Sequence, residues 1–360
     1  MTLVLNDLRS AELGAAVAPL GIPADVARRT FAAVHQRGAP AQPAFERVRG
    51  LSRRGAAALA AARAGRLEVA SRRLSPADRF LKYLFRLDDG ALVEAVRIPL
   101  PAGPDATPEK YVLCISSQAG CALACAFCAT GRSGLVRNLA PWEIVDQVAR
   151  IRDEADRPVR GIVFMGQGEP FMNYDAVIAA ADILSDPSAF AIDKKAITIS
   201  TAGIVPAVRR FTAERHRYRL AISLTSAIEE KRARLMPIER KHPLDQLLAA
   251  ARAHAEATRS RITLEYVAMS GVNLGEDDAR ALVDRLRGMR VRLNLIDVND
   301  ATGRFRPPGA DELARFRDWL TPLGQPIVRR YSGGKDVEAA CGMLAADHLV
   351  RERVRVSQIT

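Results

Sequence analysis

Residues 111–131 read YVLCISSQAGCALACAFCATG and combine two signals in one stretch. The first six residues are mostly apolar or β-branched, as in a short buried strand. Cys121, Cys125 and Cys128 follow on the next loop in a CxxxCxxC spacing. Three thiolates can hold a four-iron cluster and leave one iron without a protein ligand, so that a small molecule can bind that iron. The stretch therefore predicts an α/β fold in which a strand leads into a catalytic [4Fe–4S] cluster.

A structural zinc site is the alternative interpretation of these three cysteines. Such a site needs four ligands. His35 and His216 are remote in the sequence, and Cys114 belongs to the predicted strand rather than to the loop. The spacing therefore favours the iron–sulfur cluster over zinc.

Short apolar runs alternate with helical patterns from Tyr111 onward. This alternation predicts a parallel sheet that closes into a barrel or part of one. In such barrels the functional residues gather at the C-terminal ends of the strands. The expected strands are 111–116, 161–165, 196–200, 218–223, 262–268, 290–296 and 326–331, and the expected helices are 141–153, 173–185, 243–257, 276–287 and 311–320.

Residues 1–82 predict a small helical N-terminal domain with a basic surface. Helical apolar spacing recurs at 7–19, 23–36 and 54–64. Residues 1–80 hold 13 Arg against 6 Asp and Glu, an excess of seven positive charges out of the net +12 of the chain. We expect this domain to contact a nucleic acid.

A β-hairpin is expected next, because two apolar, partly alternating runs flank Asp88-Asp89-Gly90. We expect residues 83–108 to form this hairpin as a connector. Residues 109–350 then form the core, which includes a segment near the C-terminus that carries Cys341.

The overall charge and the cysteine content limit the class of protein. A net charge of +12 favours a polyanionic partner, most simply nucleic acid, although a solvated arginine-rich surface is the alternative. Five cysteines are few and odd in number, which argues against a disulfide scaffold. No apolar stretch is long enough to span a membrane, and the N-terminus lacks the pattern of a secretory signal. We expect a cytoplasmic protein in a reducing compartment.

Several further stretches, together with the cysteine loop, resemble one enzyme family, the RlmN/Cfr family of the radical S-adenosylmethionine (SAM) superfamily. The resemblance runs from about residue 84 to residue 347, and it implies a partial (β/α)6-type radical SAM barrel. Enzymes of this family methylate an adenine of RNA at C2 or C8. The stretches are NLAPWEIVDQV (138–148), FMGQGEPFMNYD (164–175), ITISTAGIVPAVRRF (197–211), LAISLTSA (220–227), RARLMPIERKHPL (232–244) and AACGML (339–344).

The resemblance implies how SAM is held. The open iron chelates the amino and carboxylate groups of SAM, and Gly168 and Glu169 belong to the motif for the amino group, with Glu169 as acceptor. Without the resemblance, this glycine-rich turn would indicate only a tight connection between strand and helix. The other implied SAM contacts are Ser200, Ser223, Leu224, Thr225 and Asn299.

The resemblance also implies roles for two cysteines and a glutamate. Cys341 is the methyl carrier, and the reaction uses two SAM molecules per turnover. Cys114 attacks the sulfur of the Cys341 crosslink and releases the product by a disulfide-forming step. Glu94 is the general base that removes the C2 proton. Considered alone, Cys341 and Cys114 would be interpreted as buried cysteines that act as small apolar residues.

Three positions differ from the usual pattern of the family. Thr225 stands where a histidine is usual, and Leu135 stands where a phenylalanine is usual. Asn299-Asp300-Ala301 replaces a proline-rich run. These differences bear on the SAM ribose pocket and on substrate identity more than on the mechanism.

The expected reaction is radical methylation of an adenine at C2 in 23S ribosomal RNA, with transfer RNA as a further substrate. The alternatives are C8 methylation, a radical SAM enzyme acting on a non-RNA substrate, and a non-catalytic RNA-binding protein. We expect a monomer that receives electrons from flavodoxin or ferredoxin. The candidate phosphate contacts are Arg53, Arg54, Arg63, Arg66, Arg72, Arg73, Arg132 and Arg137.

Overall fold

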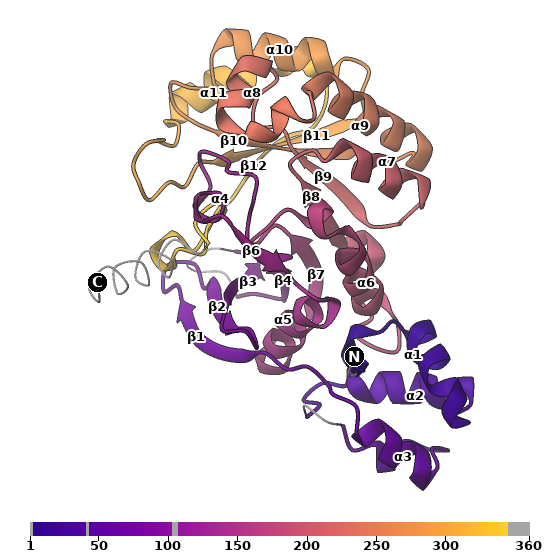
Figure 1. The fold of residues 1–360 in the computed structure, drawn as a ribbon. Helices are drawn as coiled ribbons and strands as arrows, with labels where there is room; N and C mark the ends of the chain where they lie inside the picture. Colours follow the sequence, from indigo (N-terminus) through magenta and orange to yellow (C-terminus); the bar gives the residue numbers. More distant parts are fainter. Residues whose placement is uncertain (1–2, 41–42, 103–106, 345–360) are drawn as a thin grey trace, which may run out of the picture.

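The computed structural model describes residues 3–40, 43–102 and 107–344 and contains one curved sheet of ten strands (Figure 1). Seven of these strands are parallel and follow one another in chain order, which confirms the predicted α/β partial barrel. They are β4 (Lys110–Cys114), β7 (Val159–Phe164), β8 (Ile197–Thr201), β9 (Arg219–Ser223), β10 (Ile262–Ala268), β11 (Val291–Asp297) and β12 (Ile327–Arg330). Residues 345–350 of the predicted core lie outside the described residues.

Three antiparallel strands extend the sheet beyond β4. The predicted hairpin is confirmed as β2 (Leu81–Arg86) and β3 (Leu92–Leu100), whose register places Arg86 opposite Leu92. β1 (Glu68–Leu74) pairs with β2 and lies within the region that we predicted to be helical. β1 is a largely exposed edge strand, so it needs few apolar residues. Its charged residues hide the alternating apolar pattern by which a strand is predicted.

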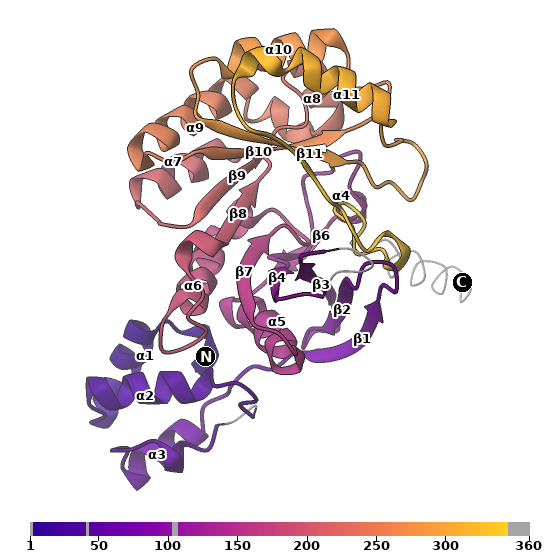
Figure 2. The same cartoon turned by 180° about the vertical axis from the view of Figure 1, so that it is seen from behind.

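Helices surround the outside of the curved sheet, as Figures 1 and 2 show. α5, for example, begins with Pro141, and its first turn is capped where the Ala140 N–H donates to Glu143 at 2.8 Å. The five predicted helices are α5 (Pro141–Glu154), α6 (Tyr174–Ser185), α9 (Leu244–Thr258), α10 (Glu276–Leu286) and α11 (Ala310–Trp319), and the structure adds α4 (Ala129–Ser133), α7 (Val205–Ala213) and α8 (Glu229–Leu235).

The N-terminal helices are α1 (Ser10–Val17), α2 (Ala24–Val34) and α3 (Arg53–Ala60). They lie below α5 and α6 in Figure 1, at the opposite end of the molecule from α10. Two hydrogen bonds tie the segment to α5: the Leu67 N–H donates to the buried Asp146 at 2.6 Å, and the Trp142 N–H donates to Asp7 at 3.0 Å. The domain is therefore docked on the core rather than joined to it by a linker alone. No helix within the described ranges is long and apolar enough to cross a membrane.

Candidate active site

The cysteine loop lies between two short paired strands, β5 (Gln118–Gly120) and β6 (Leu135–Asn138). The Cys121 N–H donates to the Gly134 carbonyl at 2.9 Å, and the Cys128 N–H donates to the Cys125 carbonyl at 3.1 Å. All three cysteines line one cavity of about 180 Å³ at the C-terminal ends of the parallel strands. The structure therefore brings the predicted cluster ligands together where the barrel rule places a site.

The three thiols fit a [4Fe–4S] cluster better than a single metal ion. No three His, Cys, Asp or Glu side chains of the described chain are close enough to hold one ion. In a four-iron cluster each thiolate binds a different iron, so the sulfurs are spaced more widely than around one ion. Burial raises the pKa of Cys121 to about 11 and that of Cys125 well above its usual value, so the thiols need a strong electrophile such as iron to become thiolates.

A buried cation lies beside this loop. Arg232 is fully buried, makes an ion pair with Glu239 at 3.2 Å and donates to the Ala202 carbonyl at 2.7 Å. Its charge lowers the pKa of Cys125, and its Nε has no hydrogen-bond partner among the described residues. A cation at this position suits a loop that carries several thiolates.

Glu169 lines the same cavity, and its carboxylate is fixed by the main chain. Its two oxygens accept hydrogen bonds from the N–H groups of Phe171 at 3.0 Å and Ala202 at 2.7 Å. Burial raises the pKa of Glu169 to about 6, so the side chain ionises near neutrality and favours a cationic partner. This is the chemistry required to accept a hydrogen bond from an ammonium group.

Gly168, which precedes this carboxylate, cannot be replaced without strain. Its φ is +97°, and a Cβ there would lie 2.5 Å from the Gln118 side chain. The amide of Gln118 in turn accepts the Glu169 N–H at 2.7 Å. The glycine thus lets β5 approach closely enough to orient Glu169.

Ser200, Ser223 and Asn299 also line the cavity, each at or just after the end of a strand. Leu224 and Thr225, by contrast, are fully buried behind the lining. Their N–H groups donate to the Glu265 carbonyl at 2.8 and 3.3 Å. We therefore assign these two residues to the turn that positions Ser223.

Thr225 adopts an unusual backbone conformation. Its φ is +59°, in the left-handed region that β-branched residues rarely adopt, and its hydroxyl has no hydrogen-bond partner in the described part of the chain. Asn273 donates to the Thr225 carbonyl at 2.7 Å and holds the strained turn in place. The substitution of threonine for the family histidine thus falls on a residue whose backbone is set by its surroundings.

Cys341 opens onto the cavity from the C-terminal segment. The Asn299 amide donates to the Cys341 carbonyl at 3.3 Å and to the Ser332 hydroxyl at 2.9 Å, and that hydroxyl accepts the Cys341 N–H at 3.4 Å. The next residue contacts the cluster loop, since the Ala129 N–H donates to the Gly342 carbonyl at 2.8 Å. The segment is therefore held against both the cysteine loop and the end of β11.

Comparisons with known proteins agree with this arrangement. The radical SAM superfamily model matches residues 115–283. A probable RNA methyltransferase of Myxococcus xanthus is 51% identical over 343 residues, which cover 95% of this chain and 94% of the relative. The dual-specificity RNA methyltransferase RlmN of Geobacter sulfurreducens is 45% identical over 264 residues, covering 73% and 71%. The chain belongs to the RlmN/Cfr family of radical SAM enzymes.

A solved structure of a radical SAM methyltransferase from Sphaerobacter thermophilus extends the likeness to the whole fold. It is 35% identical, with a TM-score of 0.85, and the match covers 96% of this chain and all of that one. The N-terminal helices and the β-hairpin are thus included in the likeness.

Cys114, the second family cysteine, is buried on β4 behind the cavity. Burial raises its pKa to about 12, the Cys341 thiol adds to that effect, and the positive charge of Arg330 opposes it. Arg330 is partly buried and lines the cavity with Cys341. Both thiols and Glu265 lie within range of its charge. Its guanidinium lies 3.6 Å from Glu265 and 3.3 Å from the Met165 sulfur. No motif of the sequence points to this arginine.

All five cysteines are free thiols, including Cys114 and Cys341. The Cys114–Cys341 disulfide that the resemblance implies for the release step is not present among the described residues.

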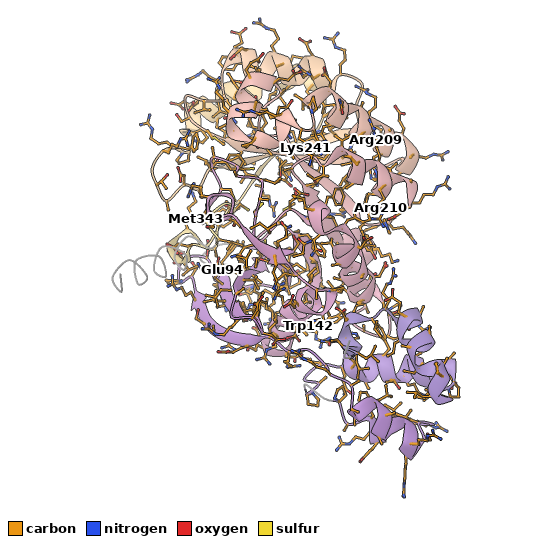
Figure 3. All side chains as sticks on the ribbon, in the orientation of Figure 1. Glu94, Trp142, Arg209, Arg210, Lys241 and Met343 are labelled. Carbon is orange, nitrogen blue, oxygen red and sulfur yellow. The ribbon has the colours of Figure 1, made fainter. Side chains whose placement is uncertain are left out.

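Glu94 lies on β3, in the sheet below the C-terminal segment in Figure 3, and does not line the cavity. The fully buried Lys82–Glu94 pair has a separation of 3.2 Å, and the Gln167 amide donates to the carboxylate at 3.4 Å. Lys82 also lies 3.6 Å from Glu338, three residues before Cys341. Glu94 is therefore buried in the sheet next to the active-site cavity rather than in its lining.

The arginines expected to bind phosphate are mostly engaged within the protein. Six of the eight make ion pairs: Arg63 with Asp88, Arg66 with Asp153, Arg72 with Glu154, Arg73 with Glu338, Arg132 with Asp300, and Arg137 with Asp89 and Glu143. Arg53 and Arg54 are exposed on α3 and make no ion pair with the described residues. The charge of residues 1–80 is therefore less available than the sequence indicates.

Proposed function

We propose that this chain methylates an adenine of RNA at C2 and that Cys341 carries the methyl group. One observation supports the proposal above all others. Cys341 lines the same cavity as the three cluster cysteines and Glu169, with the buried Cys114 behind it.

Cys121, Cys125 and Cys128 would hold the [4Fe–4S] cluster. When bound, the cluster and SAM supply a 5′-deoxyadenosyl radical, with two SAM molecules used per turnover. Glu169 would accept the SAM ammonium group, since its carboxylate is buried and oriented by two N–H groups. Ser200, Ser223 and Asn299 offer hydroxyl and amide groups around the same cavity.

A cysteine that carries the methyl group makes methylation of adenine C2 chemically possible. C2 of adenine is not nucleophilic, so it cannot simply attack the methyl group of SAM. A methyl group on the Cys341 sulfur can instead lose a hydrogen atom and then form a carbon–carbon bond to the ring. Asn299 and Ser332 fix the main chain of Cys341 for this task through hydrogen bonds of 2.9 to 3.4 Å.

Release of the product is assigned to Cys114. Its thiolate would attack the Cys341 sulfur and form a Cys114–Cys341 disulfide, while the sulfur–carbon bond breaks and the released carbon takes up a proton to become the methyl group. An external thiol would then reduce the disulfide. Arg330 would stabilise this thiolate, since it is the partly buried cation whose charge lowers the pKa of Cys114. Glu94 remains our candidate for the base that takes the C2 proton; Lys82 and Gln167 fix its carboxylate beside the strand that carries Cys114.

The substrate we propose is 23S ribosomal RNA, with transfer RNA as a second substrate. Relatives of this chain are described as RNA methyltransferases, which supports the choice. A base inside folded RNA must leave its stack to reach a cavity, so the target adenine is flipped out. We further propose that the enzyme works as a cytoplasmic monomer with flavodoxin or ferredoxin as electron donor.

The regiochemistry is tested by mass spectrometry of nucleosides. Reconstituted protein is incubated anaerobically with SAM, a reductant and 23S ribosomal RNA from a strain that lacks the enzyme. The expected product is 2-methyladenosine. The isomer 8-methyladenosine would replace the C2 assignment with C8, and methylation of no RNA at all would overturn the proposal.

A further inference from the structure

A second hollow, of about 640 Å³, opens at the N-terminal ends of β8 to β11, between these strand starts and the helices α7 and α9. It is distinct from the cavity of the cluster cysteines. No Asp or Glu belongs to the described residues that line it. Its cations are Lys195, Arg215, Arg217, Arg219, Arg261 and Arg292, and we call it the basic groove.

The cations of the basic groove are exposed, and none of the six makes an ion pair with a described residue. The nearest carboxylate along the chain, Glu214, is already engaged by Tyr174 and His216 and by Arg210, which is labelled in Figure 3. Six positive charges around one hollow repel one another unless an anion neutralises them. This distinguishes the groove from the paired arginines of the N-terminal domain.

The strand register aligns several of these cations. Thr263 is paired with Arg292 on one side and with Ala221 on the other. Arg219 is two residues before Ala221 and therefore projects from the same face of the sheet. The sheet thus presents a row of guanidinium groups across adjacent strand starts.

The basic groove and the active site lie at opposite ends of the parallel strands. β10 has seven residues, so the two ends are roughly 20 Å apart. Glu265 and Val267, from the middle and the far end of β10, line the active-site cavity, whereas Thr263, the second residue of the strand, lines the groove. A ligand in the groove cannot be the reacting adenine, but a macromolecule can reach both places.

We propose that the basic groove binds the phosphodiester backbone of the RNA substrate at a point away from the target base. This inference rests on the proposed function. A small anion with two or three charges would leave at least half of the six cations unneutralised, whereas a polynucleotide strand brings one phosphate per nucleotide. The tyrosine in the groove, Tyr218, is buried, so the groove offers no exposed tyrosine for stacking a base. The groove therefore positions RNA without reading its sequence.

The test removes four groove charges in R217A/R219A/R261A/R292A. The matched control is R280A/R287A/R315A/R317A, which also removes four exposed arginines. Arg280 lies on α10 and Arg287 directly after it, and the other two lie on α11. Affinity for 23S ribosomal RNA is measured between about 0.05 and 0.3 M salt. Each lost phosphate contact lowers the slope of log affinity against log salt by about 0.7–0.9. For the groove variant we expect the magnitude of this slope to fall by about 3 and the RNA affinity to fall at least tenfold. For the control variant we expect little change in either quantity.

SAM binding without RNA is measured on the same preparations. It should be unchanged in both variants, because none of the substituted arginines lines the cavity. If the groove variant binds RNA like the control, the inference is wrong even though the proposed function stands. If the wild-type protein shows no salt-dependent RNA affinity, the proposed function itself fails. If the variant keeps RNA affinity but loses binding to anionic phospholipid vesicles, a membrane surface replaces RNA as the partner.

Discussion

Replacing Arg330 with Met should slow the release of product from Cys341 without preventing the earlier steps. Burial raises the pKa of Cys114 to about 12, and the positive charge of the partly buried Arg330 opposes this rise. An opposite charge at close range lowers a pKa by roughly 1–3, and we take about 1–2 here because the guanidinium is partly exposed. Because the thiolate is the attacking species, loss of the charge should reduce its fraction at a fixed pH by about 10- to 100-fold.

The assay follows the covalent protein–RNA species on a denaturing gel after a single turnover. In Arg330→Met this species should persist about 10- to 100-fold longer at pH 8 than in the wild type. The Cys114 thiol loses its proton as the pH rises, so decay of the crosslink should be faster at higher pH. Without the positive charge the pKa of Cys114 is higher, and the pH at which the decay becomes fast should therefore be higher in the variant. Arg330→Lys keeps the charge and should restore much of the rate.

Arg329→Met is the matched control. Arg329 is the preceding residue on β12, but its side chain is half exposed and paired with Asp297 at 2.7 Å. Since Arg330 also faces Glu265, the double variant with Glu265→Gln avoids leaving a buried carboxylate unpaired. Decay of the crosslink at the wild-type rate and pH in Arg330→Met would refute the role assigned to this arginine.

Three other changes probe separate parts of the structure. Gly168→Ala places a Cβ 2.5 Å from Gln118 at a φ of +97°, so SAM affinity measured by equilibrium binding should fall at least tenfold while iron content stays normal. Cys125→Ala should abolish SAM cleavage after anaerobic reconstitution, and a zinc-containing, iron-free protein with full activity would contradict the cluster. Asp146→Asn should remove a pH dependence of the free energy of unfolding. Burial raises the pKa of Asp146 to about 6, so the carboxyl keeps its proton to a higher pH in the folded protein than in the unfolded chain. The free energy of unfolding of the wild type, measured in urea, should therefore fall by ~3 kcal/mol between about pH 4 and pH 6.

The sequence predicted the parallel sheet well because its strands are short apolar runs that, apart from the edge strand β12, are largely buried. All seven expected parallel strands are present within one or two residues at each end. The edge strand β1 was missed because its residues are largely exposed and charged. Helices α7 and α8 were missed as well; they are short, and α8 has only two buried residues, Arg232 and Leu235.

The site was predicted where local motifs carry the chemistry. The CxxxCxxC loop, the Gly168-Glu169 turn and Cys341 all reach one cavity. What could not be predicted depends on contacts between distant residues. Arg330 faces Cys114 across more than two hundred residues, and Arg73 pairs with Glu338 across a similar span. Neither contact produces a local pattern in the sequence from which it could be predicted.

The central claim is that Cys341 carries the methyl group and Cys114 releases the product. The most direct measurement is mass spectrometry of the peptide that contains Ala340-Cys341-Gly342, taken from the Cys114→Ala variant after reaction with 23S ribosomal RNA. The account predicts that this peptide carries one extra methyl group before RNA is added and a covalently joined adenine nucleotide afterwards. A Cys341 that is never methylated, or a Cys114→Ala variant that releases methylated RNA at the wild-type rate, would contradict it.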